Sequence, residues 1–144
     1  GPMRSYRTGR SDIVCHSYYG SRCTMLNTHL QRCPEFLAGD HTRLRELLHP
    51  AKASLALGYS LAHGLLAPGQ QSLWHRLKSS EVYYFIAGRG VMKVEDESVA
   101  VEAGSVIYVP PGAKQSLVNN GTAPIEFLCL VDPAWTAEDE AVGE

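Results

Sequence analysis

From Ser54 onward the chain is divided into short apolar segments, which are separated by Gly, Pro and Asn. Examples are EVYYFIAG, SVIYVPPG and IEFLCLVD. Each has the length of a β-strand, and no segment with the 3.6-residue apolar spacing of a helix lies between them. Short strands joined at regular intervals by turns are typical of an antiparallel sandwich or barrel. Residues 54–135 therefore predict an all-β barrel domain.

The sequence outside this barrel segment divides into four parts. Residues 1–2 resemble the scar of a cleaved expression tag. Residues 3–36 lack helical or strand periodicity and predict an irregular N-terminal arm. Within 37–53, a turn precedes TRLRELLH (42–49), in which three leucines would share one side of a short helix that Pro50 stops. Residues 136–144 form an acidic tail that we expect to fray.

Composition excludes several classes of protein. The 144 residues are 44% hydrophobic, which suits one domain with one core. The net charge is -2 and Lys and Arg are not clustered, so nucleic acid is not an expected partner. No apolar run approaches the roughly 18 residues of a membrane span, and we expect a cytoplasmic protein. The four cysteines match neither a CxxC metal site nor a compact disulfide scaffold, which favours reduced thiols.

Two groups of residues recur at fixed spacings within the barrel segment. The first group is Gly69, His75, Leu77, Glu81 and Gly88. The second group is Gly104, Pro110, Gly112, Gln115 and Asn119. Their spacings resemble the two sequence motifs of the cupin superfamily, G-x5-H-x-H-x3-E-x6-G and G-x5-P-x-G-x2-H-x3-N. Every glycine of the motifs is present, as are the proline, the glutamate and the asparagine, whereas two histidines are replaced.

The resemblance implies a double-stranded β-helix, or jelly roll, with an interior pocket that often holds a divalent metal. In that family three histidines and one glutamate bind the metal. His75 and Glu81 occupy two of these four positions, while Leu77 and Gln115 occupy the other two. The predicted metal ligands are therefore His75, Glu81 and Gln115, with zinc, manganese, iron or nickel as candidate ions, or no metal at all.

Alternation along the strands predicts which other side chains face the interior. Residues two apart in a strand share a face, so position 77 points inward with His75. By the same rule, Tyr83 and Phe85 follow Glu81 inward, and Leu117 follows Gln115. The predicted substrate pocket also includes His63, as a replacement ligand from an earlier strand. It comprises Leu77, Tyr83, Phe85, Gln115, Leu117 and His63.

Three uses of the polar groups remain open at this point. They could hold a metal, they could form a buried hydrogen-bonded network without one, or they could transfer protons, with Glu81, His75 and Tyr83 as catalytic residues. We accordingly expect a small-molecule-binding cupin that acts on or senses a small polar metabolite, such as a carbohydrate derivative or a carboxylate, with or without a metal. The alternative is a metal-free binding or sensing module with no catalytic activity.

The residue replacements also bear on the type of enzyme. An oxygenase iron commonly requires two histidines and a carboxylate, and only one such histidine is present here. A metal-assisted isomerase or lyase is therefore favoured over a dioxygenase.

Small cupins often pair through their outer sheets, so we expect a homodimer.

Overall fold

The computed structural model describes residues 14–15 and 25–143 of the chain. Within this part, strands dominate and helices are short: α1 (Pro50–Ala53) and two 3-10 turns (Leu30–Arg32 and Ala137–Asp139). The strands are β1 (Val14–Cys15), β2 (Leu26–Asn27), β3 (Glu35–Leu37), β4 (Arg43–Leu48), β5 (Ser60–Leu66), β6 (His75–Leu77), β7 (Ser80–Ala87), β8 (Gly90–Val94), β9 (Glu97–Val101), β10 (Val106–Val109), β11 (Gln115–Val118), β12 (Ile125–Asp132) and β13 (Glu140–Val142).

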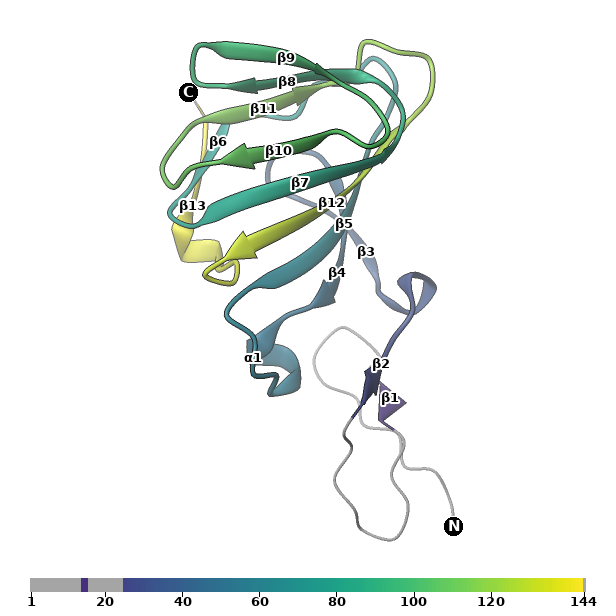
Figure 1. The fold of residues 1–144 in the computed structure, drawn as a ribbon, viewed down its shortest axis with the longest axis vertical. Coiled ribbons are helices and arrows are strands. Elements are labelled where there is room, and N and C mark those ends of the chain that lie inside the picture. The colour runs from purple at the N-terminus through teal and green to yellow at the C-terminus, as the bar shows by residue number, and fades with distance from the viewer. Residues whose placement is uncertain (1–13, 16–24, 144) are drawn as a thin grey trace, which may run out of the picture.

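Two antiparallel sheets form the barrel (Figure 1). The six-stranded sheet has the order β10-β7-β12-β5-β4-β3, and the five-stranded sheet has the order β13-β6-β11-β8-β9. Neighbouring strands that are far apart in sequence, such as β5 and β12, pair over seven residues from Ile125↔Leu66 to Val131↔Ser60. This mostly β architecture confirms the predicted jelly roll.

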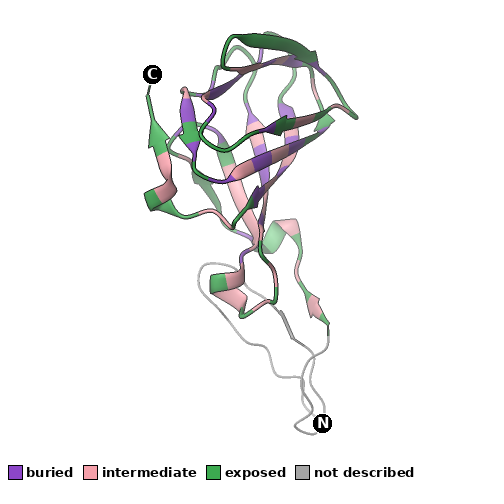
Figure 2. Cartoon of the chain, turned by 60° about the vertical axis from the view of Figure 1, so that its left-hand side comes forward, coloured by how far each residue is buried: buried purple, intermediate pink, exposed green. Residues whose placement is uncertain are grey.

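The core lies between the two sheets, where alternate side chains of β6, β7 and β12 are buried (Figure 2). Three aromatic rings are stacked or tilted against one another, with centroids 5.5 Å apart for Tyr83 and Phe127 and 6.0 Å apart for Phe85 and Phe127. Gly64 makes this packing possible, because a Cβ at that position would lie 2.3 Å from the Phe127 ring. Gly64 on β5 therefore lets the Phe127 ring pack directly against the backbone of this strand.

The predicted helix at 42–49 is wrong, since residues 43–48 form strand β4. This strand pairs with β3 on one side and with β5 on the other, and tertiary pairing here overrides the local pattern. Its pairing register with β5 shifts between Glu46 and Leu48. Such an irregularity interrupts the two-residue period of a strand, which explains why the leucine spacing suggested a helix. The only α-helix of the described chain begins at Pro50 instead, capped by the His49 side chain.

Both ends of the chain contribute more structure than their composition predicts. The segment expected to be an irregular arm contains β2 and β3, although residues 1–13 and 16–24, including the suspected tag scar, lie outside the described residues. The tail expected to fray contains β13, which pairs with β6 from Glu140↔Leu77 to Val142↔His75. The barrel therefore extends beyond 54–135 in both directions.

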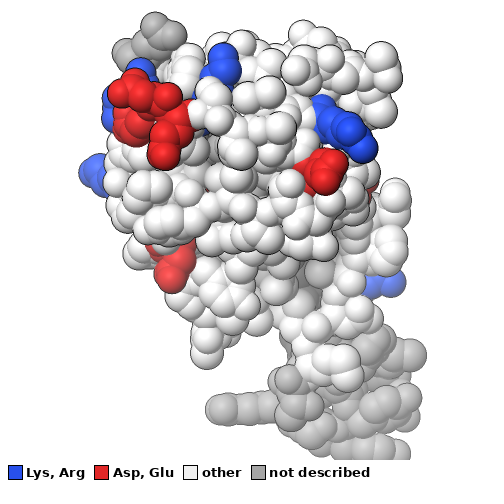
Figure 3. Space-filling model, turned by 45° about the horizontal axis from the view of Figure 1, so that its top comes forward, with Lys and Arg blue, Asp and Glu red and all other residues white. Residues whose placement is uncertain are grey.

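The remaining sequence expectations concern thiols, membranes and surface charge. Cys33 and Cys129 are free and buried. The side chain of Cys15 and the whole of Cys23 lie outside the described part of the chain. No helix in the described part of the chain is long and apolar enough to span a bilayer. On the face drawn in Figure 3, the Lys and Arg side chains do not gather into one patch, and some of them lie beside acidic side chains.

Candidate functional site

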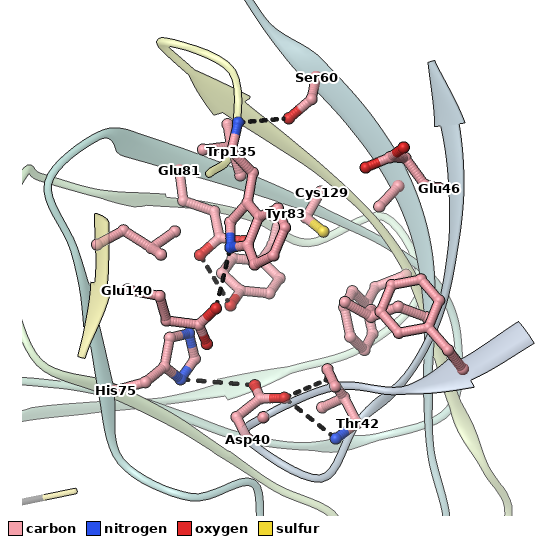
Figure 4. A pocket seen from close by; sticks show the side chains of 18 of the residues that line it. Asp40, Thr42, Glu46, Ser60, His75, Glu81, Tyr83, Cys129, Trp135 and Glu140 are labelled. Atoms are coloured by element: carbon pink, nitrogen blue, oxygen red, sulfur yellow. Dashed lines mark hydrogen bonds and ion pairs between the residues drawn. The ribbon is translucent and has the colours of Figure 1, made fainter. Parts of the chain in front are cut away.

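A cavity of ≈ 300 Å³ opens into the barrel interior (Figure 4). Strands β6, β7 and β12 contribute one part of its lining, with His75, Glu81 and Cys129 among the residues. Strands β4 and β5 contribute further residues, and segments closer to the two ends of the described chain add others, including Asp40 and Glu140. This volume lies at the lower end of the range for small-molecule sites in proteins.

Three polar side chains form a hydrogen-bonded network at the inner end of the cavity. The Tyr83 hydroxyl donates to Gln115 Oε1 at 2.5 Å and lies 3.2 Å from Glu81 Oε1. The Gln115 amide nitrogen donates to Glu81 Oε1 at 2.9 Å. Both contacts to Glu81 end on Oε1, so Oε2 is the carboxyl oxygen that neither Tyr83 nor Gln115 engages.

Burial changes the acidity of this network. Desolvation raises the pKa of Glu81 above the ordinary 4.5, and nearby His75 opposes that shift. Burial also raises the pKa of the Tyr83 hydroxyl well above 10.0 and the pKa of the Cys129 thiol well above 9.0, in both cases with a further contribution from Glu81. A carboxyl group that keeps its proton beyond the usual range can act as an acid toward a bound molecule.

His75 lies beside this network and is held by its Nδ1 atom. That nitrogen is 3.3 Å from the carbonyl oxygen of Leu73 and 3.5 Å from Asp40 Oδ2. Because both neighbours accept hydrogen bonds, Nδ1 carries the proton in the neutral ring, and Nε2 is left as an acceptor. The described residues provide no hydrogen bond to Nε2, and Figure 4 shows this side of the ring directed into the cavity.

Trp135 and Glu140 form the rim on the C-terminal side. The backbone carbonyl of Trp135 accepts a hydrogen bond from His49 Nε2 at 2.7 Å, and its backbone N–H donates to Ser60 Oγ at 2.9 Å. The indole N–H donates to Glu140 Oε2 at 2.9 Å. In the view of Figure 4 the Glu140 carboxylate lies between the indole and the His75 ring. The rim is therefore fixed by hydrogen bonds on both sides of the tryptophan.

The structure brings together most of the residues that strand alternation places inside the barrel. His75, Leu77, Glu81 and Tyr83 are all buried and line the cavity. Three further predicted residues are also buried but lie behind this lining, in the barrel core or the polar network: Phe85, Gln115 and Leu117.

His63 does not belong to the cavity, contrary to the prediction. It is buried, but it directly follows Ala62, which lines the cavity and pairs with Cys129 on β12. Adjacent residues of a strand face opposite sides of the sheet. His63 therefore points to the opposite face of the sheet, where its Nε2 atom lies 3.2 Å from Glu126 Oε1. No residue of the two motifs lies on β5, so the sequence did not indicate which of its adjacent residues faces inward.

Sequence reasoning missed the polar residues that come from outside the central barrel. Asp40 receives hydrogen bonds from Thr42 through the backbone N–H at 3.1 Å and the hydroxyl at 2.6 Å, which hold it toward His75. Glu140 faces inward because it pairs with inward-facing Leu77. No motif marks either residue, and only the strand pairing reveals them. For Cys129, in contrast, alternation along IEFLCLVD was a usable signal.

The donors in this cavity do not fit a divalent metal. Such sites require at least three firm donors from the protein. Both functional atoms of the Gln115 amide are already engaged with Tyr83 and Glu81, and Leu77 offers no donor. No cluster of three or more His, Cys, Asp or Glu side chains suited to a metal occurs among residues 14–15 and 25–143. The predicted set of His75, Glu81 and Gln115 is thus arranged as a hydrogen-bonded network.

Comparison with known proteins gives one family match. The model of the Cupin domain matches residues 62–131. An uncharacterized protein from Methanocaldococcus jannaschii is 31% identical over 121 residues, which cover 83% of this chain and 96% of that protein. An oxalate-binding protein from Thermotoga maritima is 31% identical over 67 residues, 46% of this chain and 55% of that protein.

A solved structure shows the same fold. The cupin 2 conserved barrel domain protein from Salinispora arenicola superposes with a TM-score of 0.66, covering 80% of this chain and 92% of that chain at 22% sequence identity. The likeness at this identity concerns the fold.

Proposed function

The chain belongs to the cupin domain family, and from this membership we propose that its barrel cavity binds a small polar organic molecule and transfers protons to and from it without a metal. The binding of a small molecule has support from the family match and from a relative named an oxalate-binding protein. The transfer of protons without a metal rests on the chemistry of the cavity.

One observation carries the proposal: an acid and a base line the same cavity. The buried Glu81 carboxyl group has a raised pKa, and the Nε2 atom of His75 has no hydrogen-bond partner among the residues that the structure describes. His75 Nε2 can take a proton from a bound molecule, and Glu81 Oε2 can return one to another atom of it. The Asp40 carboxylate beside Nδ1 stabilises the imidazolium that forms.

This pair suits redox-neutral chemistry, namely an isomerisation or the elimination of a leaving group. In an isomerisation the base removes a proton from carbon, and the acid protonates a different atom. In an elimination the base removes a proton, the electron pair forms a double bond, and the acid protonates the departing oxygen. Neither reaction requires an oxidant or a further co-reactant.

The proposal is tested by screening polar metabolites against the protein in the presence of a chelator. Thermal shift and ligand-observed NMR should identify molecules that bind to chelator-treated protein. For each molecule that binds, NMR in D₂O should show deuterium incorporation catalysed by the wild-type chain. His75→Ala should weaken binding about tenfold or more and abolish deuterium exchange, since the base is lost.

A matched control is available in His63→Ala, because His63 is equally buried but faces away from the cavity. It should retain both binding and exchange. His75→Gln serves as a second variant if the alanine form does not fold. Binding that appears only after zinc, manganese, iron or nickel is added would contradict the proposal, as would full deuterium exchange in both folded His75 variants.

A further inference from the structure

The charges around the cavity are mostly negative. Asp40, Glu46 and Glu140 line the cavity beside Glu81, whose pKa is raised, whereas no lysine or arginine is among the lining residues. Lys52, outside the lining, forms an ion pair with Glu46 at 2.6 Å and balances that carboxylate. Glu140 has no cationic partner among the ion pairs of the described residues, and its Oε2 atom accepts only the neutral indole N–H of Trp135.

Three of the hydrogen-bond donors of the lining are already used within the protein. The Tyr83 hydroxyl donates to Gln115, the Thr42 hydroxyl donates to Asp40, and the Trp135 indole donates to Glu140. A carboxylate or phosphate ligand needs donors or cations, and the lining leaves few of either for it. An anion would also approach the carboxylates of the lining without compensation.

Acceptors, in contrast, remain available to a ligand. The His75 side chain is 6% exposed, and its Nε2 atom points into the cavity without a partner in the described chain. Glu140 uses Oε2 for the indole, which leaves Oε1 for another donor. These acceptors come from adjacent strands, because β13 pairs directly with β6.

Aromatic rings form other parts of the wall. Phe36, Phe127, Tyr83 and Trp135 line the cavity together with the acceptors. Aromatic faces attract a cation and also pack against apolar groups. Rings combined with carboxylates favour a ligand that has an apolar body and a positively charged nitrogen.

We propose that the cavity selects a small organic cation, in which a protonated amine donates to Glu140 while the rest of the molecule packs on the aromatic wall. This rests on the proposed function, because it names the ligand class of the same cavity. It also separates this chain from its relative named an oxalate-binding protein, since oxalate is a dianion.

A series of three probes of similar size tests the charge preference. The probes are 2-phenylethylamine, 2-phenylethanol and phenylacetate, which carry a positive, a neutral and a negative polar group at pH 7.5. Affinities are measured by calorimetry and ligand-observed NMR with the full-length chain. The amine should bind about tenfold or more tightly than the alcohol, and phenylacetate should bind most weakly.

Glu140→Gln identifies the group responsible, because glutamine keeps an acceptor for the indole but removes the charge. This variant should weaken amine binding about tenfold and leave the alcohol within about twofold. Glu138→Gln is the matched control, since Glu138 is exposed two residues away and its substitution changes the net charge equally. It should leave all three affinities unchanged.

The outcomes separate this inference from the proposed function. Phenylacetate binding as tightly as the amine would overturn the charge preference and leave small-molecule binding intact. Equal affinities for amine and alcohol, or an unchanged amine affinity in Glu140→Gln, would do the same. If the wild-type chain bound none of the probes and no molecule of the metabolite screen, both proposals would be wrong.

Discussion

The hydrogen bond between Tyr83 and Gln115 gives a prediction that can be worked out in detail. Tyr83→Phe removes a hydroxyl group that lies 2.5 Å from Gln115 Oε1, and Gln115 is fully buried. Leaving one buried acceptor unpaired costs about 1–3 kcal/mol, so we expect the free energy of unfolding to fall by that amount.

Gln115→Leu has a related effect, because it removes the acceptor of Tyr83 and a donor to Glu81. We expect a loss of about 1–3 kcal/mol here as well. In the double variant neither side of the Tyr83–Gln115 hydrogen bond is left unpaired, although Glu81 loses both of its partners. The double variant should therefore be more stable than the sum of the single effects predicts, by about 1–2 kcal/mol.

Urea unfolding at pH 7 of the four proteins in this cycle measures the coupling. Tyr84→Phe is the control, since Tyr84 is adjacent in sequence but 46% exposed, and its variant should stay within about 0.5 kcal/mol of wild type. Additive effects of the two substitutions would refute the network as an energetic unit. A loss in Tyr84→Phe equal to that in Tyr83→Phe would also refute the role of burial.

Three further predictions concern other parts of the molecule. Glu81 has a raised pKa in the folded state, where His75, Tyr83, Asp40 and Cys129 surround it. Its contribution to the free energy of unfolding is therefore complete below pH 4.5 and is lost as the pH rises through the folded pKa. Glu81→Gln should therefore gain stability relative to wild type as the pH rises from 4.5, and urea unfolding that shows a constant difference contradicts this. Gly64→Ala should destabilise by about 1–3 kcal/mol, because the added Cβ would collide with the Phe127 ring; an unchanged melting curve would show that the ring moves at little cost. We also expect a homodimer that uses the exposed apolar face of β7 and β10, so Tyr108→Glu should halve the mass in sedimentation, and an unchanged dimer would exclude this face.

Strand alternation predicted the central barrel well, for a physical reason. A strand with one buried face must alternate, so the inward positions of β6, β7 and β11 follow once a single inward residue is known. His75 supplied that reference through the motif spacing, and the burial of Leu77, Glu81, Tyr83 and Leu117 agrees with it. For β5 no such reference existed, and His63 was placed on the wrong face.

The parts that sequence could not predict depend on pairing between distant segments. The leucines of β4 fit a helical period equally well, and only the neighbouring strands β3 and β5 decide the outcome. Glu140 lies in an acidic segment whose composition indicates fraying, but its pairing with Leu77 makes it part of the cavity wall. Similarly, the metal prediction counted ligand types, while the bonds of Gln115 to Tyr83 and Glu81 decide what these groups are available to do.

The strands that border the barrel have a consequence for how proteins of this kind diversify. The family match covers residues 62–131, which supply His75 and Glu81, whereas Asp40, Trp135 and Glu140 come from segments on either side of it. The groups proposed to transfer protons and the Glu140 carboxylate proposed to face the ligand's charge thus belong to separate stretches of sequence. Substitutions in the flanking segments can exchange one ligand class for another while the central barrel keeps its packing. Members of the family with closely similar barrels are therefore expected to differ in what they bind, and the sequence flanking the barrel is the place to look for that difference.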